Sequence, residues 1–182
     1  PANQATAIQL FSGGSGTLVE PYQIANLADL LFLSENDTYW GNYSFIQTAD
    51  INASATSTWN SGEGFSPIGD NSNKFNGQYN GQNYTIDGLT INRNSSSIGL
   101  FGCTNTGVTI ENIGLTNCSI TGIHWVGGLV GNNYYGSINN SYSTGNVTGT
   151  GNYVGGLVGA NDQTASINNS YSSGTVTGAG TW

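Results

Sequence analysis

The sequence predicts an all-β protein built as a parallel β-helix, or β-solenoid, with coils of about 28 residues. The phrase VGGLVG occurs twice with this spacing, at Val126–Gly131 and at Val154–Gly159. In both copies the apolar residues alternate over short runs, as in β-strands, and glycine or asparagine ends each run. A fixed period of about 20–50 residues is typical of units that stack on one another. We therefore expect each copy to form one coil of three short strands.

A weaker third copy precedes these two, with IGLFG at Ile98–Gly102 and TIENIGLTNCSITG at Thr109–Gly122. Coils that stack in register place like residues in ladders along the axis, much as in cross-β structures. We expect isoleucine over isoleucine inside, tyrosine over tyrosine, and asparagine over asparagine at the turns. The equivalent positions are Ile110, Ile138 and Ile167; Asn112, Asn140 and Asn169; and Tyr142 and Tyr171.

The N-terminal half fits the same plan less regularly. We expect one continuous solenoid domain, with irregular coils over residues 1–97 and repeat coils over 98–182. One short helix is predicted near residues 25–36, with Asn26 as its N-cap, because a solenoid has to cover its open ends. The alternating segment 1–10 can serve as an added strand. The apolar stripe of the helix consists of Ile24, Leu27, Leu30, Leu31 and Phe32.

The composition excludes several classes of function. Only 7% of the 182 residues are charged, the net charge is −8, and Lys74 and Arg93 are the only basic residues. Nucleic-acid binding is excluded because neutralising phosphates requires many lysines and arginines. Membrane insertion is not expected because no apolar run approaches the ~18 residues of a membrane-spanning helix. Recurrent isoleucine, valine, leucine and aromatic residues still predict a folded protein with a small core.

The candidate catalytic groups do not form a recognisable site. The acidic residues are scattered, and no two lie at ladder spacing within the repeats, whereas glycoside hydrolysis needs a pair of carboxylates. Glu63 and Asp70 flank GFSPIG but are expected to be solvated loop carboxylates, and His124 is expected to be structural or exposed. The stretch Gly69–Gly77 lacks the bidentate acid of a calcium loop. We predict no catalytic residue, no cofactor and no metal site.

Two kinds of covalent feature remain open. Cys103 and Cys118 either form a disulfide, which would be worth roughly 3 kcal/mol for a loop of about 15 residues, or remain as two buried thiols. Asn-x-Ser/Thr sequences accept N-linked glycans only in a secreted protein whose host glycosylates asparagine. The candidate glycosylation sites are Asn36, Asn42, Asn52, Asn83, Asn94, Asn117, Asn139, Asn146 and Asn168.

The stretch VGGLVGNNYYGSINNSYSTGNVTG resembles the GLUG-type repeat of bacterial and archaeal surface proteins. The preceding phrases GTLVEPYQI, FIQTADIN and SPIG, and the run from Phe75 to Leu89, resemble the segment that commonly precedes such repeats. This resemblance implies a right-handed parallel β-helix of the pectate-lyase-like type, on or outside the cell, as in adhesin-like proteins. Related modules are attached to IgA-cleaving metalloproteases. The His-Glu-x-x-His zinc motif of those enzymes is missing here, so the resemblance implies no protease activity.

Together these observations favour a non-catalytic extracellular solenoid with a structural or adhesive role. In the earlier copies, the segment equivalent to the final phrase TGAGTW leads into a new repeat. We therefore expect the last coil to be open, with strand edges that no further coil covers. Either it belongs to a longer repeat array, or it stacks head to tail on another copy and builds a filament. The expected partners are therefore the protein itself or host and cell-surface glycans. The candidate assembly surface comprises Val154, Tyr171 and Trp182.

The alternative from another class is a polysaccharide-binding or polysaccharide-degrading module. Exposed aromatic residues can stack on sugar rings, although stacking within the solenoid itself is the more ordinary role of such residues. The aromatic residues concerned are Trp125, Tyr134, Tyr135, Tyr142, Tyr153 and Tyr171.

Overall fold

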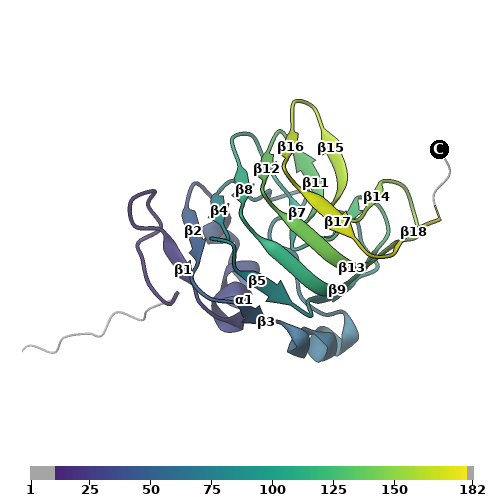
Figure 1. Ribbon diagram of the computed structural model, residues 1–182, viewed down its shortest axis with the longest axis horizontal. Helices are drawn as coiled ribbons and strands as arrows, with labels where there is room; N and C mark the ends of the chain where they lie inside the picture. Colours follow the sequence, from purple (N-terminus) through teal and green to yellow (C-terminus); the bar gives the residue numbers. More distant parts are fainter. Residues whose placement is uncertain (1–10, 180–182) are drawn as a thin grey trace, which may run out of the picture.

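A computed structural model describes residues 11–179, and in it the chain winds as a parallel β-helix, which confirms the predicted fold. The coils follow one another from the N-terminal to the C-terminal end of the stack (Figure 1). All pairings between the named strands are parallel. Segment 1–10, which was considered as an added strand, lies outside the described residues.

One face of the solenoid is a six-stranded sheet that runs through both the irregular and the repeat coils, as Figure 1 shows. Its strands are three or four residues long, and each coil contributes one of them. In spatial order they are β1 (Tyr22–Ile24), β2 (Ser44–Gln47), β4 (Gln78–Asn80), β8 (Thr109–Glu111), β12 (Ser137–Asn139) and β16 (Ser166–Asn168).

A second face is a seven-stranded sheet that contains the two longest strands of the protein. Each long strand pairs with two short strands of a neighbouring coil. The members are β3 (Ile51–Asn52), β5 (Thr85–Asp87), β6 (Thr90–Asn92), β9 (Gly114–Gly122), β13 (Tyr142–Gly149), β17 (Tyr171–Ser173) and β18 (Val176–Gly178).

The VGGLVG phrases build the remaining face of the repeat coils. Each phrase forms two strands, so the coil that begins at Val126 has four strands and the coil that begins at Val154 has five, rather than the three that we predicted. Gly127 ends the first strand, directly before the bend at residues 128–129, and a Cβ atom there would lie 2.2 Å from the carbonyl oxygen of Val130. The strands are β7 (Phe101–Cys103), β11 (Val130–Tyr134) and β15 (Val158–Asp162) in one sheet, and β10 (Val126–Gly127) and β14 (Val154–Gly155) in another.

The register between coils matches the ladders predicted from the repeat. Ile138 aligns with Ile110 on one side and with Ile167 on the other. At the turn that follows, the Asn140 side-chain amide donates to Oδ1 of Asn112 over 3.1 Å, and Asn169 donates to Asn140 over 3.4 Å. All three asparagines have φ near +50°, in the left-handed region that asparagine tolerates better than most residues.

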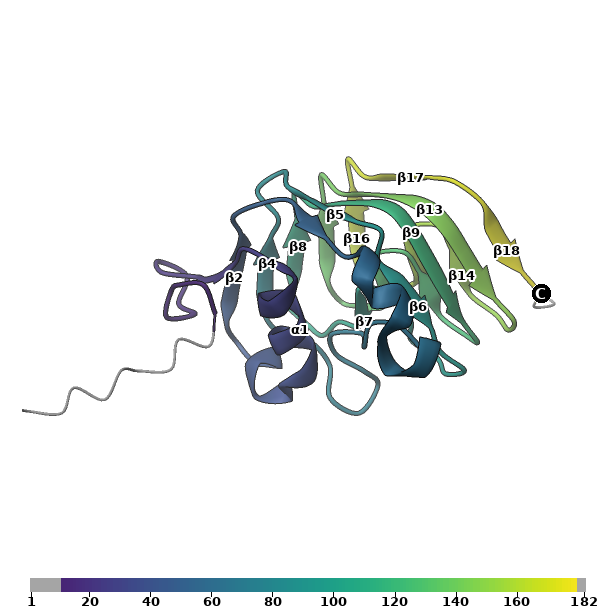
Figure 2. The same ribbon diagram turned by 90° about the horizontal axis from the view of Figure 1, so that it is seen from below.

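The N-terminal end differs because helices replace part of the coil. Helix α1 (Leu27–Glu35) lies within the predicted range, and the Asn26 side chain caps it by accepting from the amides of Ala28 and Asp29. Two 3-10 helices, η1 (Asp37–Trp40) and η2 (Ser54–Gly62), were not predicted, because polar segments of this length lack an apolar period. Figure 2 shows α1 near the N-terminal end of the stack and β17 and β18 at the opposite end.

The core runs through the whole stack without interruption. Phe45, Phe75 and Phe101 lie one over the next, with ring centroids 6.1 and 5.0 Å apart, so the ladder crosses from the irregular coils into the repeat coils. Of the predicted helix stripe, Leu30 is fully buried on α1, whereas Ile24 is fully buried on strand β1 and does not belong to the helix. Leu33, which we did not include in the stripe, is equally buried. The two halves named from the sequence therefore share one core.

Candidate functional site

The last coil exposes side chains that the preceding coils bury at equivalent positions. Ile110 and Ile138 are fully buried, whereas Ile167, the next residue in the same ladder, is 39% exposed. Val176 aligns with Val147, and the exposed fraction rises from 1% to 47% between them. The residue types are matched, so the difference arises because, within residues 11–179, no other coil covers the last one. We call the C-terminal end of the described stack, where β16, β17 and β18 face away from β12 and β13, the open face.

Exposed large hydrophobic residues occur only towards the two ends of the described chain. Two of them, Leu18 and Val19, lie in the loop before β1. The others belong to the last coil or to the turn that leads into it. Such clustering differs from the scattered apolar residues of an ordinary protein surface and is typical of contact regions. The full set is Leu18, Val19, Tyr153, Ile167, Tyr171 and Val176.

The structure treats the three predicted assembly residues differently. Tyr171 is exposed on β17, and its ring stacks on that of Tyr142 with centroids 5.2 Å apart and planes 7° apart. Val154 lies on β14, is only half-buried, and packs against the core. Trp182 lies outside the described residues. Ile167 and Val176 also belong to the open face, and the repeat alignment could have identified both.

The aromatic residues considered as a sugar-stacking strip form separate groups. Tyr142 and Tyr171 make the ladder described above, and Trp125 and Tyr153 make a second one, with centroids 6.1 Å and planes 11° apart. A third group joins Tyr134 to Tyr135 edge-on, and the Lys74 ammonium lies 5.5 Å from the Tyr134 ring. Within the described residues, the first two groups are stacking between neighbouring coils, as expected of an ordinary solenoid, and the third is an edge-on contact between adjacent residues.

The candidate catalytic groups are engaged in local contacts. Glu63 forms an ion pair with Arg93 at 3.2 Å. Asp70 accepts from the backbone amides of Ser72 and Asn73, which makes a turn within the segment considered as a calcium loop. His124 accepts through Nδ1 from the backbone amide of Asn152 at 2.8 Å. Within residues 11–179, no three His, Cys, Asp or Glu side chains are grouped so that they could hold a metal ion.

The two cysteines are free thiols in this structure, so the disulfide considered from the sequence is not formed. Cys103 lies on β7 and Cys118 on β9, in different sheets, and both are buried. Burial raises the pKa of the Cys103 thiol to about 11. Burial also raises the pKa of Cys118, while a contact with the Ser143 hydroxyl acts in the opposite direction. Both side chains therefore stay protonated and act as small core residues.

Most of the candidate glycosylation sites lie on the surface. Asn36 and Asn139 are half-buried, and Asn36 uses its amide to donate to the carbonyl oxygen of Phe32 at 2.7 Å. The others are exposed, at Asn42, Asn52, Asn83, Asn94, Asn117, Asn146 and Asn168.

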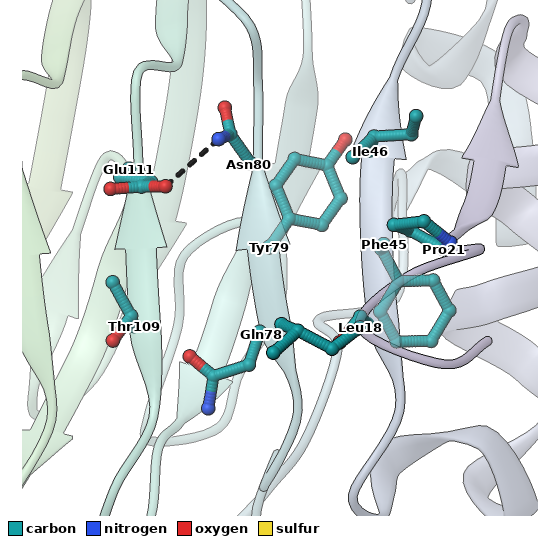
Figure 3. Close-up of a pocket in the computed structure, with 10 residues that line it drawn as sticks. Leu18, Pro21, Phe45, Ile46, Gln78, Tyr79, Asn80, Thr109 and Glu111 are labelled. Atoms are coloured by element: carbon teal, nitrogen blue, oxygen red, sulfur yellow. Dashed lines mark hydrogen bonds between the residues drawn. The ribbon is translucent and has the colours of Figure 1, made fainter.

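The sequence did not predict a groove on the outer face of the six-stranded sheet, shown in Figure 3. Its cavity volume is about 310 Å³, which is at the lower end for small-molecule sites. Polar side chains form the floor, and Leu18 and Pro21 from the preceding loop form an apolar wall. The alternation of residues along the strands could have predicted which side chains form the floor. The position of the loop with Leu18 and Pro21 could be known only from the structure. The polar floor residues are Ser44, Gln78, Asn80, Thr109 and Glu111.

The architecture defines the chain as a parallel β-helix with GLUG repeats. A family model for the GLUG motif matches residues 126–148 and 150–177, which are the two complete repeats, and this confirms the resemblance. Within the described residues, no helix is long and apolar enough to cross a membrane.

The chain is similar in sequence to parts of two longer proteins. Over 160 residues it is 43% identical to halomucin of Haloquadratum walsbyi. This alignment covers 85% of the chain and 2% of halomucin. Over 132 residues it is 38% identical to a protein of Evansella cellulosilytica assigned as a Gly-rich membrane protein. This alignment covers 69% of the chain and 15% of that protein. The chain thus spans a small part of each relative's length.

The structural relative is a candidate immunoglobulin A1 protease from Bacteroides ovatus. The TM-score is 0.75 at 25% identity, and the match covers 94% of this chain and 53% of that protein. The chain is therefore a GLUG-repeat β-helix related in sequence to part of halomucin.

Proposed function

We propose that this chain is a non-catalytic β-solenoid with a structural or adhesive role outside the cell or at its surface. The assignment of one relative as a membrane protein supports such a location. The engagement of Glu63, Asp70 and His124 in turns and pairs supports a role that needs no catalysis. The exposed asparagine sequons are compatible with a glycosylated extracellular protein.

The observation that carries the proposal is the regular stacking of the coils, in which Ile110, Ile138 and Ile167 follow one another in a single ladder. A coil stacked on the open face would rebury Ile167 and Val176 and continue the ladder that ends at Tyr171. The asparagine ladder is directional, because each asparagine donates to the one in the preceding coil. Oδ1 of Asn169 is therefore positioned to accept from an asparagine of the next coil.

We further propose that separate copies stack head to tail into a filament. The strands of the six-stranded sheet are all parallel, so β16 of one copy and β1 of the next would run in the same direction in a head-to-tail contact. The exposed Val19 in the loop before β1 and the exposed Ile167 and Val176 of the last coil are apolar side chains that such a contact can remove from water. The backbone of Gln23 already exchanges hydrogen bonds with Ser12 and Gly13, so the contact has to form around that segment.

Negative-stain electron microscopy and sedimentation velocity test this proposal on the same concentrated sample. We expect uniform fibres whose fraction rises with concentration, because a head-to-tail contact does not close. Discrete dimers would contradict head-to-tail stacking, since they indicate a closed tail-to-tail contact. A monomer at every concentration would contradict assembly through this face altogether.

A double variant with Ile167→Asp and Val176→Asp sharpens the test. The two carboxylates would have to be buried without partners in the contact, so assembly should be lost. The matched control is the double variant with Ser57→Asp and Thr58→Asp, which adds the same charge on the exposed surface of η2. Fibres that persist in the first variant, or disappear equally in both, would contradict a role for the open face.

A further inference from the structure

Two rows of outward side chains run along the axis of the solenoid on the six-stranded sheet. Five strands of this sheet, β2, β4, β8, β12 and β16, each contribute one residue to each row. The pairing register places the residues of a row side by side. We call these two rows the polar track. One row is Ser44, Gln78, Thr109, Ser137 and Ser166, and the other is Ile46, Asn80, Glu111, Asn139 and Asn168.

The track is a linear array with a regular step. Neighbouring strands lie about 4.8 Å apart, so the five strands span about 19 Å from first to last. Hydroxyl, amide or carboxylate groups recur at this step, with Ile46 as the exception. A ligand that matches such an array has to be a chain whose own polar groups repeat at a similar interval, as they do in a polysaccharide.

The loop before β1 converts one end of the track into a groove. Leu18 is 81% exposed and, in Figure 3, extends across the sheet near Gln78 and Tyr79. Pro21 and Ile46 complete an apolar wall beside the polar floor. A sugar ring presents apolar C–H groups on its faces and hydroxyls around its edge, so it can satisfy a site with both kinds of surface.

The floor is rich in hydrogen-bond acceptors. Asn80 uses its amide to donate to Oε1 of Glu111 at 2.8 Å, and Gln78 donates to the carbonyl oxygen of Gly107 at 2.8 Å. Within the described residues, Oε2 of Glu111 and Oε1 of Gln78 make no hydrogen bond that would compete with a ligand. The hydroxyls of Ser44 and Thr109 can donate or accept. Such a floor suits a ligand with many hydroxyl donors.

The charge of the track restricts the ligand further. Glu111 is its only charged side chain, so the floor carries negative charge with no cation to balance it. The two basic residues are placed elsewhere, with Arg93 paired to Glu63 and Lys74 beside Tyr134. Anionic polysaccharides and nucleic acids would meet an uncompensated carboxylate, and a neutral ligand would not.

The track also differs from a peptide-binding site. Extended peptides bind sheets by adding a strand at a free edge, where the backbone offers unpaired groups. The floor of the groove is instead the face of a sheet whose central strands are paired on both sides, so only side chains are available. We propose that the polar track binds a neutral glycan chain that lies along the solenoid axis, with Leu18 covering the end over β2 and β4.

Affinity electrophoresis in native gels tests the proposal on the protein produced without N-glycosylation, since Asn139 and Asn168 lie on the track. The gels contain neutral soluble polysaccharides (a glucan, a mannan, a galactan or a xylan), and a polygalacturonate gel serves as the anionic comparison. We expect at least one neutral polysaccharide to slow the protein and polygalacturonate to have no such effect. Failure of all four neutral polysaccharides, or retardation by polygalacturonate alone, would overturn the proposal.

Variants then locate the binding site. Thr109→Arg places a long side chain across the track and should weaken binding at least tenfold. Glu111→Gln keeps the shape but removes the charged acceptor and should weaken binding roughly tenfold, as expected for a hydrogen bond to a charged group. The controls are Thr58→Arg and Glu35→Gln, which make the same changes at exposed positions on η2 and α1. Equal binding by Thr109→Arg and its control would overturn the proposal.

This proposal can fail independently of the assembly proposal. The Ile167→Asp and Val176→Asp double variant changes the open face and leaves the groove intact, so it should lose assembly and keep glycan binding. Thr109→Arg should have the opposite effect. Circular dichroism and the thermal unfolding midpoint of each variant establish that it remains folded.

Discussion

The two ends of the described solenoid differ in how far they cover the apolar core. At the N-terminal end, helix α1 and a cluster of aromatic rings cover the apolar interior, and residues 12 and 13 hydrogen-bond with the first strand. At the C-terminal end of the described chain, the last coil is bare and its apolar side chains face outward. The cluster consists of Phe11, Tyr22, Phe32, Tyr39, Tyr43 and Phe45.

This difference shows that burial in a repeat protein is a property of neighbouring coils rather than of a residue's own coil. Ile138 and Ile167 occupy the same place in nearly the same sequence, yet only one of them is buried. Stability in such proteins is approximately the sum of the coils and the contacts between them. The N-terminal end closes its stack with dedicated elements, and the C-terminal end repeats the coil pattern without any such closure within the described residues.

The largest predicted effect comes from matched substitutions along the isoleucine ladder. Ile138→Ala should lower the free energy of unfolding by about 2–5 kcal/mol, because it leaves a cavity between two coils. Ile167→Ala should cost about 1 kcal/mol or less in the dilute protein, since its side chain is partly in water already. Urea unfolding followed by circular dichroism measures both. Equal losses would show that the last coil is as well packed as the one before it.

A second prediction concerns the turns of the repeat coils. Asn140 has a φ of 48°, so Asn140→Ala should cost about 1–2 kcal/mol through backbone strain, in addition to the loss of its ladder contacts. Asn140→Gly removes the same side chain but tolerates the left-handed backbone and should recover much of the loss. Both variants are compared by urea unfolding. If glycine is as destabilising as alanine, the ladder hydrogen bonds rather than the backbone account for the asparagine.

A third prediction tests the closure of the N-terminal end. Asn26→Ala should cost about 1 kcal/mol, because the amides of Ala28 and Asp29 lose their acceptor at the start of α1. Asn26→Ser keeps an oxygen that can cap the helix and should be close to the original protein. Thermal unfolding followed by circular dichroism provides the comparison. An unchanged Asn26→Ala variant would indicate that tertiary packing alone holds the helix in place.

The smallest predicted effect is a dependence on acid. The Thr116 hydroxyl and the Asn117 amide donate to Asp87 at 2.6 and 2.7 Å, and these hydrogen bonds lower its pKa. The stabilisation is therefore complete above the ordinary aspartate range and is lost as the pH falls through the lowered pKa. Asp87→Asn should make the unfolding midpoint less sensitive to pH between about 2 and 5. An unchanged pH profile would contradict a contribution from this carboxylate.

The repeat allowed most of the C-terminal half to be predicted from sequence. A step of 28 or 29 residues determines which side chains stack, so the isoleucine, asparagine and tyrosine ladders follow directly from alignment of the copies. The helix at Leu27–Glu35 was also predictable, because a capping asparagine precedes an apolar stripe. The division of each VGGLVG phrase into two strands was missed, since the bend after Gly127 depends on the close approach of Val130 to that glycine.

The groove is harder to predict than the ladders for a physical reason. Its floor combines irregular coils, where Ser44 and Gln78 lie, with the first repeat coil, where Thr109 and Glu111 lie, and no common phrase aligns these segments. Its wall depends on Leu18, an apolar residue that the loop leaves exposed. Sequence patterns report which residues a fold buries, and they carry little information about an apolar residue that remains outside.

Hydrogen–deuterium exchange at several protein concentrations tests the open face most directly. In dilute solution the amides of β16, β17 and β18 should exchange much faster than those of β12 and β13, which lie between two coils. At high concentration we predict that the amides of the last coil become as protected as those of β12, because a second copy then covers them. Fast exchange of β16, β17 and β18 at every concentration would contradict assembly through the open face.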